Sequence, residues 1–406
     1  MALNTVLVSC CIAGGGPAGM MLGLLLARAG VDVLVLEKHA DFLRDFRGDT
    51  IHPSTLEVMH ELGLLEDLLK LPHHKAPRLF GHVGGLSLTF ADFSHLPTRC
   101  RFIAFMPQWD FLNFLAERGG RYPAFKLMMQ AEVTGLTEDA GRVTGLKATT
   151  PNGPLEVRAN LVVGADGRHS DVRAQAGLKV RELGAPMDVL WFRLSRQPGD
   201  PEDTMARFDV GRIVVLLNRG AYWQCGYLIP KGSFEELRER GLMSFRDDLA
   251  RIAPFAADRF GELYDWDAVK LLTVRVDRLC RWYRPGLLLI GDAAHAMSPV
   301  GGVGINLAIQ DAVAAANLLA APLRSGRLST GHLRLVQRRR QWPTRATQRM
   351  QLFVQNRVLK RVLARTDPFS PPRSIRLFAR FPVLSRIPAR LIGMGFRPEH
   401  VRTPVV

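Results

Sequence analysis

A glycine-rich loop near the start of the chain has the residue types and spacing of a nucleotide-binding turn. Gly14, Gly16 and Gly19 form a Gly-x-Gly-x-x-Gly pattern between an apolar, β-branched run and a run of helix formers. Glycine allows a tight turn, a close approach of the backbone to a pyrophosphate and close packing of the helix on the strand. The N–H groups at the helix N-terminus then favour the phosphates. We therefore expect this loop, with Pro17 and Ala18 in the first helical turn, to bind a cofactor.

An acidic residue follows the next predicted strand and narrows the choice of nucleotide. Residues 31–36 are mostly apolar and β-branched, and Glu37 and Lys38 come directly after them. A carboxylate at this point can accept hydrogen bonds from both ribose hydroxyls and would repel a 2′-phosphate. FAD or NAD is therefore expected in preference to NADP. A chance glycine-rich turn is the alternative, and the combination of loop, helix, strand and acid argues against it.

Two later motifs favour FAD over NAD. The apolar run 287–290 ends in Gly291-Asp292, where the carboxylate can bond the ribityl chain that only a flavin has. A second turn, Asp166-Gly167, follows another apolar run at 161–164. With the first loop, these motifs resemble the signatures of the class A FAD-dependent aromatic hydroxylase family, the p-hydroxybenzoate hydroxylase-like flavoprotein monooxygenases. The resemblance covers about residues 5–320.

The resemblance implies an α/β fold with a glutathione-reductase-type, Rossmann-like FAD domain and an inserted, mainly antiparallel β-sheet substrate domain. We assign residues 1–72, 101–180 and 275–330 to the FAD-binding domain. Residues 73–100 and 181–274 would form the substrate-binding β-sheet domain, and residues 331–406 a helical, basic C-terminal extension. Local patterns predict helices at 53–69, 108–117, 234–240, 244–252 and 304–319, strands or a hairpin at 79–93 and a strand meander at 125–150.

The resemblance also implies the chemistry. FAD would be tightly held, NADH or NADPH would bind transiently as the electron donor, and dioxygen would be the oxidant. The expected activity is a monooxygenase reaction that proceeds through a flavin C4a-hydroperoxide and hydroxylates a phenolic, quinol or polyketide-like aromatic substrate. Because the cofactor carries this chemistry, the protein is expected to position and shield it. We assign no catalytic nucleophile and no metal site, since no Ser-His-Asp arrangement or metal-ligand spacing is present.

Several residues outside the first loop receive cofactor-binding roles from the resemblance. Asp166 and Gly167 would serve both FAD and the transient nicotinamide. Arg47 would lie along the flavin and Gln108 near the flavin and pyrophosphate, with a solvated arginine and a helix-cap glutamine as the alternatives. The glycine-rich loop before the helix at 304 would direct N–H groups at the flavin N1 and C2 carbonyl, with Pro299 over the reacting edge. The remaining residues assigned to the cofactor are Val133, Asp292, Gly302, Gly304, Ile305 and Asn306.

Aromatic residues in the strand-rich segment are the candidates for the substrate wall. Aromatic side chains at strand spacing belong to a core more often than to a pocket, so that reading stays open. A base that deprotonates a phenol would assist oxygen transfer, and composition alone offers His52, His82, His295 and Tyr222, each of which has a structural alternative. The candidates for the wall are Phe80, His82, Trp191, Phe192, Tyr222, Trp223 and Tyr227.

The net charge of +16 is concentrated in the C-terminal segment. Residues 321–406 hold 19 of the 54 Lys and Arg but two of the 38 acids, Asp367 and Glu399. No nucleic-acid motif accompanies this charge, so we expect no nucleic-acid partner. A solvated helical cap and a peripheral contact with an anionic membrane are the two remaining interpretations. The five cysteines suggest no disulfide framework, and no apolar run reaches membrane-spanning length, so a cytoplasmic protein is expected. A monomer and a homodimer are both compatible with the sequence.

Two other functions are compatible with the same motifs. The first is a flavin-dependent reductase, dehydrogenase or halogenase on this fold. Residues 221–230 echo the Trp-x-Trp-x-Ile-Pro element of halogenases, but Cys225 replaces the second Trp and no counterpart of the halogenase lysine is evident. The second is a flavin-binding protein without turnover. We favour the hydroxylase over both.

Overall fold

A largely parallel β-sheet forms the base of the molecule. The computed structural model describes residues 4–43, 50–367 and 371–406. Residues 10–13 of the central strand are fully buried and apolar, as expected for a strand covered on both faces. The strands lie in the order β19 (Tyr283–Arg284), β20 (Leu287–Leu289), β11 (Gly153–Gly164), β1 (Asn4–Ala13), β2 (Val33–Leu36) and β8 (Phe125–Met128).

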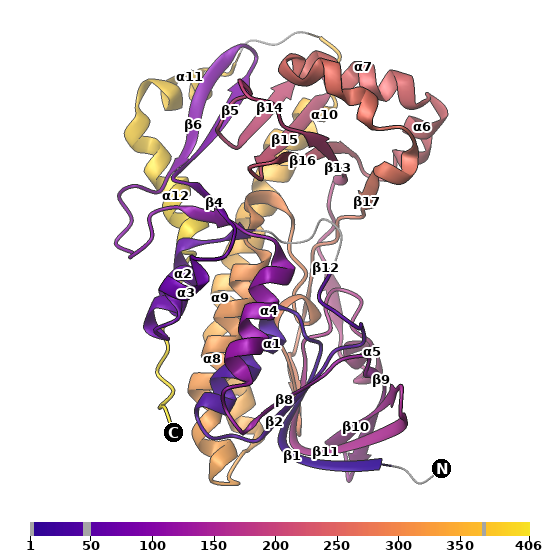
Figure 1. Cartoon of the computed structure of the whole chain (residues 1–406), viewed down its shortest axis with the longest axis vertical. Helices are drawn as coiled ribbons and strands as arrows, with labels where there is room; N and C mark the ends of the chain where they lie inside the picture. The colour runs from indigo at the N-terminus through magenta and orange to yellow at the C-terminus, as the bar shows by residue number, and fades with distance from the viewer. Residues whose placement is uncertain (1–3, 44–49, 368–370) are drawn as a thin grey trace.

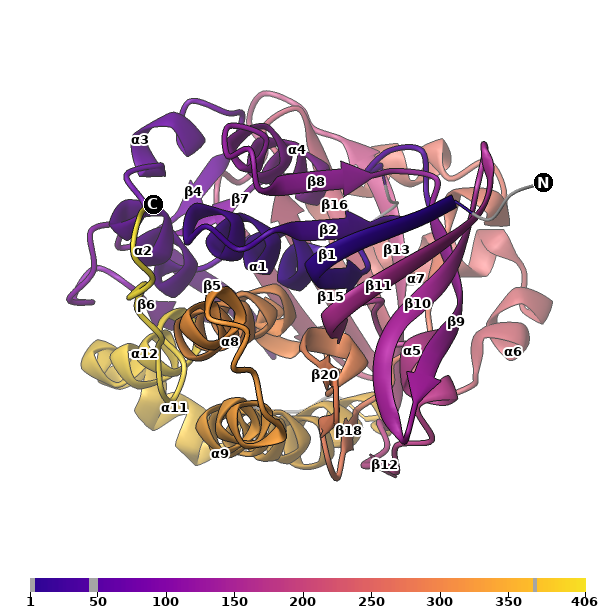
Figure 2. The same ribbon diagram turned by 90° about the horizontal axis from the view of Figure 1, so that it is seen from below.

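Helices and an antiparallel meander cover this sheet. The helix α1 (Pro17–Arg28) packs between α4 (Gln108–Gly119) and α8 (Gly304–Arg324) and contacts β1 and β2. The strands β9 (Glu132–Asp139) and β10 (Arg142–Thr150) pair antiparallel beside β11, and α5 (Asp171–Gln175) contacts β9. Figure 2 shows β9, β10 and β11 side by side, away from α1 and α8. The predicted strand–loop–helix–strand unit at the start of the chain is therefore present.

Three sequence predictions were wrong in detail. The helix expected at 53–69 is two helices, α2 (Pro53–Glu61) and α3 (Leu65–Leu68), because Gly63 lies between them with a φ of 70°. The strand β8 does not continue into the meander but pairs in parallel with β2. The strand expected at 161–164 is the end of the longer β11.

A second, mainly antiparallel sheet lies above the first in Figure 1. The helices α6 (Phe234–Glu239) and α7 (Leu242–Ile252) and a 3₁₀ segment, Pro254–Glu262, belong to its side of the molecule. The only parallel pair in this sheet is β14 with β5, among the described residues. The strand order is β17 (Lys270–Leu272), β13 (Met187–Ser195), β16 (Tyr222–Pro230), β15 (Arg212–Asn218), β14 (Met205–Asp209), β5 (Arg78–Val83) and β6 (Leu86–Asp92).

Small sheets join the two large ones. One has the order β3 (Thr50–Ile51), β7 (Ile103–Phe105) and β4 (His74–Ala76), so part of the segment 73–100 pairs outside the large antiparallel sheet. The other pairs β12 (Val180–Glu182) with β18 (Asp277–Leu279). The remaining 3₁₀ turns are Trp266–Ala268, Gly291–Ala293, Val300–Gly302 and Pro382–Ser385.

The C-terminal segment runs along both large sheets. The helix α9 (Thr330–Val354) packs on α8 and continues through a π-helix, Gln355–Leu359, into α10 (Lys360–Leu363). Figure 1 shows this column extending up to the second sheet, where α10 contacts β15 and β16. Two further helices follow, α11 (Arg373–Arg380) and α12 (Arg386–Gly393), both in contact with β6.

The membrane interpretation stays a prediction. Exposed Leu377, Phe381, Val383 and Ile387 lie among the arginines of α11 and α12. One helical stretch, Val300–Arg324, has the length and apolar composition of a membrane span, contrary to our expectation. In the folded protein, 78% of the most apolar part of this stretch is buried, as in the core helix of a soluble protein. The stretch is therefore weak evidence for a membrane span.

A buried ionic network joins α8, α9 and the last residues of the chain. The side chain of Asp311 on α8 is fully buried; its Oδ2 lies 2.5 Å from His295 Nε2 and its Oδ1 accepts from Arg340 Nε at 2.9 Å. Arg340 on α9 also donates to Glu399 at 3.2 Å. Because buried charges are tolerated when paired and hydrogen-bonded, this network dictates how α9 sits on α8.

Replacing Arg340 with Met is expected to destabilise the protein by about 3–5 kcal/mol, because Asp311 and Glu399 lose a buried partner. Urea unfolding followed by circular dichroism measures this change. The control is Arg338→Met on the same helix, where the side chain is exposed. Equal unfolding midpoints for the two variants would show that the network contributes nothing specific.

Candidate active site

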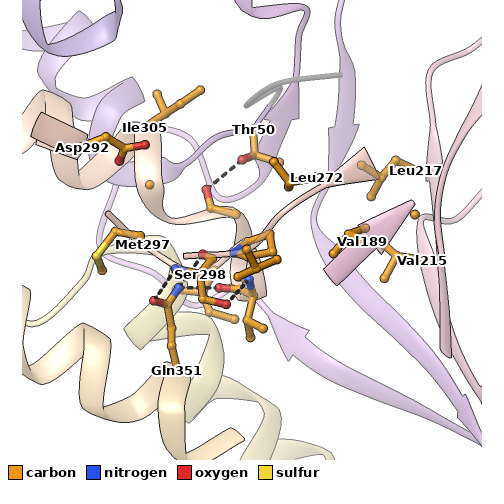
Figure 3. Close-up of a pocket in the computed structure, with 18 of the residues that line it drawn as sticks. Thr50, Val189, Val215, Leu217, Leu272, Asp292, Met297, Ser298, Ile305 and Gln351 are labelled. Carbon is orange, nitrogen blue, oxygen red and sulfur yellow. Dashed lines mark hydrogen bonds between the residues drawn. The ribbon is translucent and has the colours of Figure 1, made fainter. Parts of the chain in front are cut away.

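A large cavity, of about 1590 Å³, lies between the two sheets. Figure 3 shows Asp292, Met297 and Ser298 on one side of it and Val189 and Leu217 on the other. Most of the predicted cofactor-binding residues meet on its wall: Gly14, Gly16, Pro17, Ala18, Glu37, Lys38, Gln108, Val133, Asp166, Gly167, Asp292, Pro299, Gly302, Gly304 and Ile305.

Two predicted residues, Gly19 and Asn306, are not on that wall, and a third falls outside the described residues. Gly19 lies behind the loop, where an added Cβ would sit 2.0 Å from the Gly14 carbonyl oxygen. Asn306 follows the lining residue Ile305, and its side-chain amide makes hydrogen bonds to residues 50–55. Arg47 falls outside the described residues, so its predicted role stays a prediction.

The glycine loop is tightly packed behind and open in front. Gly14 has a φ of 107°, and an added Cβ would lie 2.5 Å from the Ala165 carbonyl oxygen. At Gly16, the N-cap of α1, nothing lies within 4 Å of the Cβ position. The loop therefore presents bare backbone and a helix N-terminus to the cavity, which fits the pyrophosphate of a dinucleotide.

Two of the predicted carboxylates, Glu37 and Asp166, already accept hydrogen bonds from neighbouring groups of the protein. Glu37 accepts from Gly15 N at 2.9 Å and from His39 N at 3.1 Å. Asp166 accepts from Ser170 Oγ at 2.5 Å and from Val172 N at 3.1 Å, and burial raises its pKa. Both side chains line the cavity, and these bonds orient the carboxylates toward it from fixed positions.

The loop from Met297 to Gly304 is clamped by glutamines that the sequence reasoning missed. Gln351 Nε2 donates to Ser298 O at 2.9 Å and Val300 O at 2.8 Å, and its Oε1 accepts from Ser298 N at 3.3 Å. Gln355 Nε2 donates to Ser298 Oγ at 2.5 Å. Both glutamines are fully buried on α9 and the π-helix that follows it. The clamp fixes the backbone between Ser298 and Val300 beside Pro299.

Two more glutamines of α9 extend the same row. Gln348 Nε2 donates to Asp277 O at 2.7 Å, and Gln337 Nε2 donates to Cys280 O at 3.0 Å. A signal was present in the sequence, since glutamines at 337, 348, 351 and 355 fall near one face of a helix. Composition obscured it, because arginines dominate that segment.

The first turn of α8 is tied to α2 and α12 through Asn306 and His52. Asn306 Oδ1 accepts from His52 N at 2.9 Å and from Thr55 Oγ1 at 2.7 Å. The ring of His52 is fully buried, and its Nδ1 lies 2.8 Å from the Ile392 carbonyl oxygen. Burial lowers the pKa of His52 to about 4, so the ring is neutral at pH 7 and donates from Nδ1.

None of the four candidate bases lines the cavity. His52 and His295 are buried in the networks already described. His82 pairs with Ser87 at 2.9 Å, and Tyr222 lies under the Arg193 guanidinium at 5.0 Å. The structure therefore favours the structural alternative for each of them.

Strand alternation explains which aromatic residues face the cavity. Of the predicted wall, Phe80 and Trp191 line it. Phe192, Trp223 and Tyr227 instead pack with α7 in a core on the other face of the sheet. Successive strand residues point to opposite faces, so Trp191 and Phe192 could not both face the cavity. The chamber beside Trp191 is mainly aliphatic, with Val189, Val215, Leu217 and Leu272 among its lining residues.

Lowering the pH from 6.5 to 4 is expected to reduce the free energy of unfolding through His52. The pKa falls from an ordinary 6.5 to about 4 on folding. The unfolded chain therefore takes up the proton first, and roughly 3 kcal/mol is lost across that window. Thermal or urea unfolding at several pH values measures it. A His52→Gln variant should show a shallower pH dependence than the native protein, and parallel profiles would contradict this assignment.

Metal chemistry has no evident support in the described residues. Within residues 4–43, 50–367 and 371–406, no group of three or more His, Cys, Asp or Glu side chains could hold a metal ion. All five cysteines are free thiols. The cavity offers instead a glycine loop for a dinucleotide, a clamped loop beside it and an apolar chamber.

Comparison with known proteins agrees with this arrangement. A family model described as FAD binding domain matches residues 7–350. The 6-methylpretetramide 4-monooxygenase of Streptomyces rimosus is 33% identical over 97% of this chain and 94% of its own length. The chain covers 63% of the longer dialkyldecalin synthase of Streptomyces rugosporus, with 30% identity over 74% of this chain.

Solved structures share the fold at lower identity. PqsL, a probable FAD-dependent monooxygenase from Pseudomonas aeruginosa, has a TM-score of 0.75 and 23% identity over 88% of this chain and 98% of its own. The p-nitrophenol 4-monooxygenase PnpA from Pseudomonas putida has a TM-score of 0.75 and 22% identity, covering 97% and 100%. The predicted resemblance is thereby confirmed, and the chain belongs to the class A FAD-dependent aromatic hydroxylase family of flavoprotein monooxygenases.

Proposed function

We propose that this protein is an FAD-dependent monooxygenase that uses NADH or NADPH and dioxygen to hydroxylate a polycyclic, polyketide-like aromatic substrate. The observation that carries the proposal is the continuity of the cavity from the glycine loop to the aliphatic chamber under the second sheet. The similarity to a 6-methylpretetramide monooxygenase over nearly the whole length supports the substrate class.

The residues present fit FAD, on the packing of the glycine loop and the carboxylates beside it. Gly14, Gly16 and the N-terminus of α1 would hold the pyrophosphate, Glu37 the ribose and Asp292 the ribityl chain. When bound, FAD supplies hydride acceptance and oxygen activation. We propose that the parallel sheet is the FAD domain and the antiparallel sheet the substrate domain.

The protein's own contribution is to position and to exclude water. Gly304 and Ile305, in the first turn of α8, line the cavity, where a helix N-terminus stabilises developing negative charge. The Gln351 side chain holds the loop that leads into α8 by its hydrogen bonds to Ser298 and Val300. The aliphatic residues of the wall, including Val189, Leu217 and Leu272, limit the water that can be held beside the reacting ring.

The test is the visible spectrum of the purified protein, followed by NADH and NADPH oxidation in air with phenols, quinols and fused-ring hydroxyaromatics. A flavin spectrum, substrate-stimulated oxidation and incorporation of label from ¹⁸O₂ are the expected results. A product without label would instead favour a cyclase, reductase or halogenase on this fold. The labelling measurement is needed because the chain is also similar to a dialkyldecalin synthase.

A Gln351→Leu substitution is expected to weaken FAD binding by roughly tenfold, because the loop loses three hydrogen bonds to its backbone. Titration of the apoprotein with FAD, followed by flavin fluorescence, measures the dissociation constant. Gln341→Leu on the same helix is the control, since the Gln341 side chain makes no hydrogen bond with the described residues. Unchanged FAD affinity for Gln351→Leu would contradict the clamp's role.

A further inference from the structure

Charge is distributed unevenly along the cavity wall. The acidic lining residues, Glu37, Glu132, Asp166, Asp171 and Asp292, all lie at the end formed by the parallel sheet and its loops. The second sheet and the C-terminal helices contribute no acidic residue to the described lining. They contribute arginines instead, so the far chamber is aliphatic with an excess of positive charge.

Two of these arginines form a pair on one helical face. Arg357 lies in the π-helix after α9, and Arg361 lies four residues later in α10, a spacing that places side chains on one face. Met350, Gln351, Val354 and Val358 line the cavity from the same column. The π-helix adds a residue to a turn, a feature that often occurs at functional sites.

Neither arginine has a partner within the part of the chain that the structure describes. No hydrogen bond or ion pair is recorded for Arg357 or Arg361, and both side chains are exposed. Like charges at this spacing repel by about 0.2–0.5 kcal/mol, so folding alone gives no reason to place them together. Arginine presents a planar fork that suits a carboxylate or another planar anion.

The length of the helix gives the distance between the clamped loop and the two arginines. Gln351 contacts Ser298 and Val300, beside Pro299. At the α-helical rise of about 1.5 Å per residue, which the π-helical turn shortens, Arg357 lies up to about 9 Å and Arg361 up to about 15 Å further along the axis. A single phenol ring cannot span that length, whereas a fused polycyclic skeleton can.

We propose that Arg357 and Arg361 form an anion subsite that binds an acidic group at the far end of a fused-ring substrate. The acidic group would be a carboxylate or an ionised enol or phenol, and the ring to be hydroxylated would lie at the Pro299 loop. The location of that ring rests on the proposed function. The arginine pair makes the enzyme selective for long, acidic aromatics over short or neutral ones.

The test measures binding separately from turnover. Isothermal titration of the FAD-loaded protein compares anthracene-2-carboxylate with the neutral anthracene-2-carboxamide at low and high salt. We expect the carboxylate to bind about tenfold more tightly at low salt, with the preference falling as salt rises. The Arg357→Gln/Arg361→Gln double variant should bind both probes equally, and Arg357→Lys should keep part of the preference.

A matched control is Arg334→Gln, an exposed arginine of α9 away from the cavity lining. Equal affinity of the native protein for both probes, or the same loss in the control, would overturn the subsite. A rise in the NADPH Michaelis constant with no change in probe binding would also overturn it, because it would assign the arginines to the nucleotide phosphates. Failure of NAD(P)H oxidation with every ring compound would sink the proposed function while leaving the carboxylate preference measurable.

Discussion

The carboxylate of Asp311 is the interaction on which the rest of the site depends. Its Oδ2 accepts from the Gly291 N–H at 3.1 Å and contacts His295, so it fixes the turn that carries Asp292. Its Oδ1 binds Arg340, which orients α9. A charge buried this deeply tolerates one arrangement of partners, because an unpaired carboxylate in an apolar interior is costly. The orientation of α9 then determines where its glutamines and arginines meet the cavity.

The column formed by α9, the π-helix and α10 therefore serves both ends of the cavity. At its lower part, glutamine side chains replace the missing backbone partners of an irregular loop, as buried peptide groups require. At its upper part, the same column forms a wall of the chamber under the second sheet. One continuous element links the loop beside the cofactor site to the site that would bind the distal part of a substrate.

The parts of the fold that the sequence predicted are those determined by neighbouring residues. The glycine loop, Glu37 and Asp292 could be placed because each depends on a turn or strand end only a few residues long. The glutamine clamp could not, because Gln351 acquires its meaning from Ser298, 53 residues away. The prediction of the substrate wall was wrong in part for another reason. Side chains alternate along a strand, so either Trp191 or Phe192 faces the cavity, and the position of α7 decides which one.

The glutamine clamp has a consequence for biosynthesis. The loop around Ser298 leaves the ribosome well before Gln351 and Gln355. Until these glutamines are made, the polar groups of the loop that they bind can form hydrogen bonds only with water. Domains fold as units as the chain emerges. The first βαβ unit can therefore form early, while the cofactor pocket can close only after most of the chain has been made. Capture of the flavin is thus a late event, and a chain truncated within α9 would keep a nucleotide-binding turn without a finished pocket.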